Sequence, residues 1–255
     1  MDEKVLFKVE DKVGWITLNR AKVLNAIDKD TLDQLVEIMG QASADPAVSV
    51  LVMTGNSRAF SVGGDIKHMM ADKSASAFRA TAHGYQALVQ AMRDVGKPII
   101  AAIDGYCLGG GLELALMCDL RIASESAKLG LPDAELGFSP TGGLTHLLTR
   151  LVGLGRAMHL AMIPDPISAA ESEHIGLVTQ VVEDDKLLNT ANEMAARLAT
   201  YPEHGLAFIK RGFYAAADAN FATTLALEEE VDVACFTHPA TQKALSDFLE
   251  SRKKK

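Results

Sequence analysis

Two glycine-rich segments have the residue types and spacing that best suit chemistry. Residues 59–66 read AFSVGGDI, and residues 104–113 read DGYCLGGGLE between an expected strand and an expected helix. Glycines at such a junction leave the first helical N–H groups unobstructed, and these donors, with the helix dipole behind them, suit a developing negative oxygen. Each segment alone is also explained as a tight turn that needs positive φ. Neither matches the glycine fingerprints of dinucleotide or nucleoside-triphosphate sites.

Glu113 is the acidic residue that lies nearest to these glycines. It follows Gly110 by three residues, which places it in the first turn of the expected helix and on the wall of the same pocket. A favourable charge at a helix N-terminus is the alternative explanation for its position. The seven histidines have no metal-ligand spacing and no G-x-S-x-G elbow occurs, so the sequence predicts neither a metal centre nor an activated serine.

Composition restricts the partners of the chain. Its 255 residues suffice for one large domain, or one domain with a small appendage, and the net charge of −8 argues against nucleic acid. No apolar run approaches the roughly 18–20 residues of a membrane span, and the charged N-terminus lacks the apolar core of a signal peptide. Three cysteines without CxxC spacing (Cys107, Cys118 and Cys235) fit a reducing compartment, so a cytoplasmic protein is expected. The basic tail, residues 252–255, is either a solvated helix end or a contact to a phosphate-bearing ligand.

Short β-branched runs alternate with amphipathic stretches, as in an α/β fold built from right-handed crossovers. The strands are expected at residues 13–19, 48–54, 99–103, 120–123 and 177–182. The helices between them are expected at residues 28–44, 75–93 and 112–118. After about residue 185 the pattern is helical only, with segments near 186–199, 203–217, 221–236 and 240–252. This division indicates an α/β core of residues 1–185 and a helical region of residues 186–255 that covers a neighbouring subunit.

Together, the two glycine-rich segments closely resemble the paired oxyanion-hole segments of the enoyl-CoA hydratase/isomerase (crotonase) family. Two further stretches are similar to that family in order and at compatible spacing: residues 19–26 (NRAKVLNA) resemble its NRPxxxNAL element beside the coenzyme, and residues 163–178 resemble its GxxIxAxEAxxxGLV stretch. The resemblance implies a crotonase (ClpP/crotonase-like) fold of repeated ββα units with a helical C-terminal trimerisation region.

The resemblance also implies the roles of individual residues. The N–H groups of Gly64 and Gly110 would hold the thioester oxygen, and Asp133 falls at the position of the family's second acid. Residues expected beside the coenzyme are Lys22, Val23, Leu24, Ala59, Val62, Asp65 and Ile66, of which Asp65 is expected to cap a helix and not to catalyse. The substrate would be an acyl-CoA thioester bound by a homo-trimer or a dimer of trimers. The implied reaction is reversible syn addition of water to a 2-enoyl-CoA, with no cofactor besides the coenzyme A of the substrate.

The sequence departs from the hydratase pattern at several positions. Hydratases of this family carry glutamate at both acid positions, and Asp133 is one methylene shorter, while Glu135 is an alternative second acid. Thr141 stands where some isomerases of the family have an acid, and the last helix lacks the usual TEDxxEG stretch, which puts coenzyme contacts of Phe248 or Arg252 in doubt. Double-bond isomerisation, acyl-serine hydrolysis and non-catalytic thioester binding therefore remain alternative functions.

Overall fold

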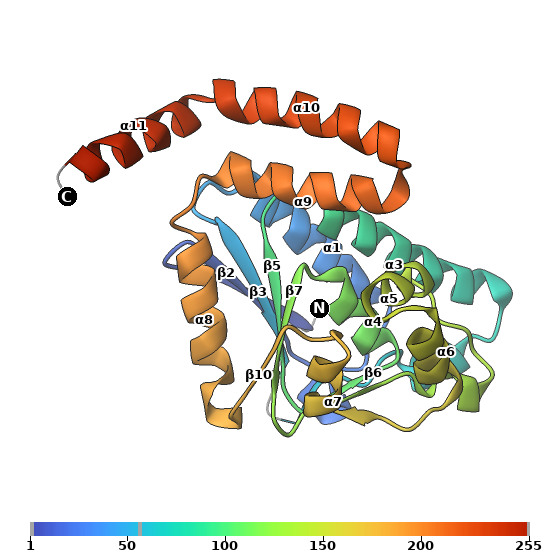
Figure 1. Cartoon of the computed structure of the whole chain (residues 1–255). Coiled ribbons are helices and arrows are strands. Elements are labelled where there is room, and N and C mark those ends of the chain that lie inside the picture. The colour runs from blue at the N-terminus through green and yellow to red at the C-terminus, as the bar shows by residue number, and fades with distance from the viewer. Residues whose placement is uncertain (1–2, 56–57, 254–255) are drawn as a thin grey trace.

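Two β-sheets with helices on their faces make up the computed structural model, which describes residues 3–55 and 58–253 (Figure 1). The larger sheet has the strand order β1-β2-β3-β5-β7-β10, and the smaller sheet has the order β4-β6-β8-β9. The strands of the larger sheet are Val5–Glu10, Val13–Leu18, Val50–Thr54, Ile99–Ile103, Leu120–Ser124 and Gln180–Val182. The strands of the smaller sheet are Ala59–Ser61, Tyr106–Leu108, Lys128–Gly130 and Ile167–Ser168. Only the pairs β1/β2 and β8/β9 are antiparallel among the described strands.

A strand of the larger sheet, a short strand of the smaller sheet and a helix follow one another three times. The units are β3-β4-α2 (α2, Ile66–Ala71), β5-β6-α4 (α4, Gly110–Met117) and β7-β8-η2 (the 3₁₀ helix η2, Pro132–Leu136). Because β3, β5 and β7 are parallel neighbours, their carboxyl ends meet at one edge of the sheet. The repeat confirms the expected ββα units and brings both glycine-rich segments and the Asp133 segment to that edge.

Each face of the larger sheet is covered by helices. On one face, α1 (Lys29–Ala44) packs against α3 (Ala75–Asp94), and α1 buries Leu32 and Leu35 in the main apolar core. On the other face, α8 (Leu187–Leu198) covers a second cluster through Leu187, Ala191 and Ala195. The central strands β3 and β5 are therefore buried on both sides, which explains their continuous apolar sequences.

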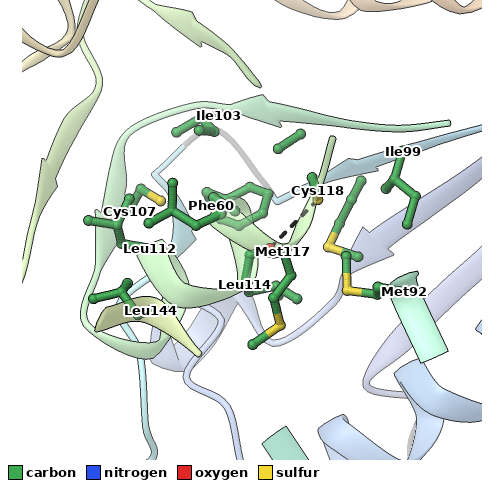
Figure 2. Close-up of a cluster of buried hydrophobic side chains, with 14 of the residues drawn as sticks. Phe60, Met92, Ile99, Ile103, Cys107, Leu112, Leu114, Met117, Cys118 and Leu144 are labelled. Atoms are coloured by element: carbon green, nitrogen blue, oxygen red, sulfur yellow. Dashed lines mark hydrogen bonds between the residues drawn. The ribbon is translucent and has the colours of Figure 1, made fainter. Parts of the chain in front are cut away.

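Helix α4 lies inside the main core and fixes the position of Glu113. All eight of its residues are buried, as expected for a helix that is apolar on nearly every side. Figure 2 shows Leu112, Leu114 and Met117 of this helix among the side chains of Phe60 and Leu144. A helix held on all sides cannot shift without opening the core, so the groups at its first turn are rigidly placed.

The C-terminal helices extend beyond the core. Helix α9 (Glu203–Asp218) lies across one end of the larger sheet, α10 (Phe221–Thr237) runs back along it, and α11 (Pro239–Lys253) continues away from the body (Figure 1). No residue of α10 is buried. The exposed apolar side chains of the three helices include Ile209, Phe213, Phe221, Leu225, Val233, Phe236, Leu245, Phe248 and Leu249. Within the described ranges, no helix has the length and apolar character needed to cross a bilayer.

Most of the expected elements are present, with boundaries that differ by a few residues. The expected strand at residues 177–182 covers only Gln180–Val182, because Leu177 and Val178 donate their N–H groups to the Ser172 carbonyl where α7 (Ala169–His174) ends. No residue range was predicted for β1, the strands of the smaller sheet, α7, or the pair α5 (Leu144–Val152) and α6 (Leu154–Met162), and α2 was expected only as the helix that Asp65 caps. Of the basic tail, Lys254 and Lys255 lie outside the described residues.

Candidate active site

The two glycine-rich turns pack backbone against backbone. A Cβ atom at Gly63 would lie 2.8 Å from the Leu108 carbonyl oxygen and 2.9 Å from the Gly110 nitrogen. Gly63 and Gly109 also have φ values of +92° and +50°, which side-chain-bearing residues rarely adopt. Glycine is therefore required at this junction by close approach as well as by backbone conformation.

The close approach brings together the two expected oxyanion donors. The position that a Cβ atom would take at Gly110 is 3.5 Å from the Gly64 nitrogen. Gly110 is the first residue of α4, and neither its N–H nor that of Gly64 donates to an acceptor among residues 3–55 and 58–253. Two N–H groups, one of them at a helix N-terminus, thus face a common space and can stabilise negative charge on an oxygen.

Glu113 lies in the first turn of α4 and is only 3% exposed. Its Oε1 accepts a 2.5 Å hydrogen bond from the Thr141 N–H, while Oε2 lies 3.7 Å from the ideal Cβ position at Gly142. Burial, opposed by the Thr141 bond and assisted by the charge of Asp133, raises the pKa of Glu113 to about 7. A carboxyl group with this pKa exchanges protons readily near neutral pH, as a general acid or base must.

Asp133 lies in η2, opposite the start of α4. Its Oδ2 is 3.6 Å from the position that a Cβ atom would take at Gly109. This oxygen is buried and has no hydrogen-bond partner among the described residues, and burial raises the pKa of the carboxyl group. An unpartnered buried carboxyl oxygen costs stability, so its presence beside the glycine turns indicates a role in chemistry.

A cavity of about 440 Å³ joins these groups. Both expected acids, Glu113 and Asp133, and both expected donors, Gly64 and Gly110, line it. The other lining residues are Val62, Ile66, Met69, Phe78, Thr81, Ala82, Tyr85, Gly109, Pro132, Leu136, Phe138, Ser139 and Thr141. The structure therefore assembles in one place the four residues that the resemblance pointed to.

One face of α3 forms a wall of this cavity through Phe78, Thr81, Ala82 and Tyr85. The Phe78 ring stacks on Phe138, with centroids 5.6 Å apart. The sequence predictions singled out none of these side chains. Their spacing of three to four residues, typical of one helix face, is the signal that identifies them.

A second hollow, of about 610 Å³, lies beside the expected coenzyme residues Lys22 and Val23. The neighbouring Leu24 accepts a hydrogen bond from the Val62 N–H over 3.1 Å, which links this segment to the first glycine turn. Asn25 reinforces the link, because its side-chain amide donates to the carbonyl oxygens of Ala59 and Phe60. The segment that resembles the coenzyme element is thus tied to the wall of the cavity.

Asp65 has the capping role expected of it. Its carboxylate accepts from the His68 N–H at the start of α2 and forms a 2.9 Å ion pair with Arg20. Burial alone would raise the pKa of Asp65, but these contacts hold it below its ordinary value. Arg20 also pairs with Asp28, the N-cap of α1, so one guanidinium joins the starts of two helices.

Two candidates lie away from the open site. The Ala59 side chain is fully buried and can offer a ligand no surface of its own, whereas Ile66 is 55% exposed at the cavity wall. The alternative acid Glu135 is exposed and does not line the cavity. Among the described residues, no group of three or more histidine, cysteine or carboxylate side chains could hold a metal ion.

Comparison with known proteins gives a consistent result. The sequence model of the enoyl-CoA hydratase/isomerase family matches residues 8–255. Among curated proteins, the chain is 35% identical to a short-chain-enoyl-CoA hydratase of Clostridium acetobutylicum, covering 98% of this chain and 95% of that protein. It is also 35% identical to a crotonyl-CoA hydratase of Syntrophomonas wolfei, covering 98% and 96%. Among solved structures, an enoyl-CoA hydratase of Bacillus anthracis superposes with a TM-score of 0.93 at 30% identity, covering 97% and 96% of the two chains.

Proposed function

Since this chain belongs to the enoyl-CoA hydratase/isomerase family and has its crotonase fold, we propose that it catalyses the reversible addition of water to a 2-enoyl-CoA. The observation that carries the proposal is one cavity lined by two acids and by two N–H groups without acceptors among the described residues. Addition of water across a conjugated thioester needs a proton acceptor, a proton donor and a site for the enolate oxygen. The residues around this cavity can supply all three.

The thioester oxygen accepts hydrogen bonds from the Gly64 and Gly110 N–H groups. When water attacks the β-carbon, the π electrons of the double bond move toward this oxygen, which gains enolate charge. The dipole of α4 favours the same charge, since Gly110 begins that helix. Removing one such donor typically costs about 10²–10³ in rate.

Glu113 takes a proton from the attacking water. Because the Thr141 N–H holds Oε1, the second oxygen remains for the water. Asp133 delivers a proton to the α-carbon, which requires its carboxyl group to be protonated when the substrate binds. The raised pKa of Asp133 supports this role, and the reverse reaction exchanges the two protonation states.

We further propose that the acyl chain is short. The Phe78–Phe138 stack lies on the cavity wall, and two relatives are named as hydratases of short-chain enoyl-CoA and of crotonyl-CoA. The hollow beside Lys22 and Val23 provides room for part of the coenzyme next to the link between Leu24 and Val62. The proposed reaction uses no cofactor besides the coenzyme A of the substrate.

The proposed assembly is a homo-trimer or a dimer of trimers in the cytoplasm. The exposed apolar side chains of α9, α10 and α11 support assembly, because they exceed what a monomer of this size ordinarily leaves in water. The three cysteines are unpaired, which supports a reducing compartment.

The experiment that tests the proposed reaction is incubation with a panel of 2-enoyl-, 3-enoyl-, dienoyl- and 3-hydroxyacyl-CoAs, followed by mass spectrometry. Hydration adds one water to 2-enoyl-CoA, and the reverse reaction removes one from 3-hydroxyacyl-CoA. Products of unchanged mass but shifted double bonds would favour an isomerase. Release of free coenzyme A would favour hydrolysis, and binding without any product would favour a non-catalytic thioester-binding subunit.

A further inference from the structure

Tyr85 places a side-chain hydroxyl beside the two N–H groups of the glycine turns. Its oxygen lies 2.2 Å from the position that a Cβ atom would take at Gly110. That same position is 3.5 Å from the Gly64 nitrogen. The hydroxyl therefore reaches the space shared by both backbone donors, and a side chain at residue 110 would displace it.

The hydroxyl and the base of the Tyr85 ring border different parts of the cavity. The ring atom Cδ1 lies 3.7 Å from the ideal Cβ position at Gly142, and Glu113 Oε2 lies at the same distance from that position. The hydroxyl is at the opposite end, against Gly110. It therefore lies beside the proposed position of the thioester oxygen.

The Tyr85 hydroxyl has a proton to donate and no acceptor among residues 3–55 and 58–253. Burial and the nearby Glu113 and Asp133 raise the pKa of the phenol above its ordinary value, so it stays neutral. Tyr85 is only 5% exposed. A hydroxyl that lines the cavity without a protein acceptor can donate its proton to a ligand oxygen that enters the cavity.

We propose that the Tyr85 hydroxyl is a third hydrogen-bond donor to the thioester oxygen, beside the Gly64 and Gly110 N–H groups. Tyr85 is then a catalytic residue whose bond strengthens as the oxygen gains enolate charge. Its effect on turnover rests on the proposed hydratase function, whereas its effect on a bound carbonyl group does not. A phenylalanine at the same place would fill the cavity equally but leave the oxygen with two donors.

The test is the infrared carbonyl band of bound [1-¹³C]butyryl-CoA, a saturated thioester that cannot be hydrated. Each hydrogen bond to the oxygen weakens the C=O bond and lowers its stretching frequency. In Tyr85→Phe the band is expected at higher frequency than in the wild type, and hydration of crotonyl-CoA is expected to fall by about 10². Tyr201→Phe is the matched control, since it removes an exposed tyrosine hydroxyl whose hydrogen-bond partner among the described residues is Arg197.

The frequency of this carbonyl band decides whether Tyr85 is a donor to the thioester oxygen. A band that Tyr85→Phe leaves unchanged overturns the third donor, even if turnover falls, because loss of packing alone would explain slower turnover. A second variant, Tyr85→3-fluorotyrosine, keeps the shape and makes the phenol a stronger donor, so the band should move to lower frequency. If the wild type hydrates crotonyl-CoA but the carbonyl band does not depend on Tyr85, only the assignment of Tyr85 as a donor is overturned. Absence of hydration with a band that depends on Tyr85 would overturn only the hydratase proposal.

Discussion

The Thr141 N–H donates a 2.5 Å hydrogen bond to Oε1 of Glu113, and this bond joins the first turn of α4 to the loop that precedes α5. Thr141 is at a position where some isomerases of the family have an acid. Here the residue contributes its backbone to the position of Glu113 instead. The bond opposes the effect of burial on the pKa of Glu113, so the carboxylate can ionise near neutral pH although it is almost fully enclosed.

Glu113 should lower the stability of the folded chain at alkaline pH. Its pKa is about 7 in the folded state against an ordinary value of 4.5, so the folded state binds this proton more tightly than the unfolded state does. Stability contributed by the protonated group is therefore lost as the pH rises from about 4.5 through 7. Between pH 4.5 and pH 8 the wild type should lose about 3 kcal/mol of unfolding free energy through this group. Glu113→Gln should not show this loss.

Urea denaturation at both pH values measures this difference. The control is Glu135→Gln, which changes an exposed acid outside the cavity and should show the same loss as the wild type. An equal response of the two variants to pH would contradict the buried, proton-binding character assigned to Glu113.

If the Gly64 N–H is part of the proposed oxyanion hole, activity should depend on a backbone donor at residue 64. Gly64→Pro removes the donor and should lower hydration by about 10² or more. Gly64→Ala keeps the donor, and its methyl group would meet only the flexible end of Met69, so this variant should retain far more turnover. Initial rates with crotonyl-CoA compare the two, after circular dichroism has shown that both are folded. Equal rates in the two variants would exclude the Gly64 N–H as a donor.

The ion pairs of Asp28 should stabilise the fold at neutral pH and lose this effect in acid, where the carboxylate is protonated. Burial alone would raise the pKa of Asp28, but hydrogen bonds from Lys4 and Thr31 and the charge of Arg20 lower it to about 2. This stability is therefore present above pH 3.8, the ordinary pKa of an aspartate, and is lost as the pH falls through 2. Asp28→Asn should cost about 2 kcal/mol at pH 7 and little at pH 2, measured by denaturation at both. A cost that does not depend on pH would show that shape, and not charge, is responsible.

Assembly should depend on the exposed apolar side chains of the C-terminal helices. Phe213 and Phe221 are each 78% exposed, and Phe236 is 61% exposed. Analytical ultracentrifugation of the full chain should show a trimer or a hexamer at micromolar concentration. Phe221→Glu should weaken the assembly, whereas Glu228→Gln on the same helix should not. A stable wild-type monomer would contradict the proposed oligomer.

The sequence was sufficient for the fold where local pattern and resemblance agreed. Strand β5 lies at the predicted residues, because Pro98 precedes it and its five residues are all apolar. Strands β4, β6, β8 and β9 have only two or three residues each, too few for any periodicity to appear. They form because β3, β5 and β7 are already aligned, a contribution of tertiary structure that no short window of sequence contains.

The candidate site was predictable to a similar degree. Glu113 and Gly110 could be placed together from their spacing, but Asp133 required the resemblance, since it is 20 residues away and on another unit. The Tyr85 hydroxyl could not be predicted, because its approach to Gly110 depends on how α3 packs against the start of α4. Side chains that meet across elements depend on packing angles, which a single sequence does not specify.

The rate of crotonyl-CoA hydration by Glu113→Gln is the measurement that tests the proposed hydratase most directly. In the proposed mechanism hydration needs Glu113 to activate water, whereas movement of a proton between two carbons could proceed with Asp133 alone. The variant should therefore lose about 10² or more of hydration, Asp133→Asn should abolish both hydration and α-proton exchange, and Asp133→Glu should preserve or raise activity. If Glu113→Gln keeps full hydration, or if the wild type isomerises a 3-enoyl-CoA far faster than it hydrates crotonyl-CoA, the hydratase proposal is contradicted and the chain is an isomerase.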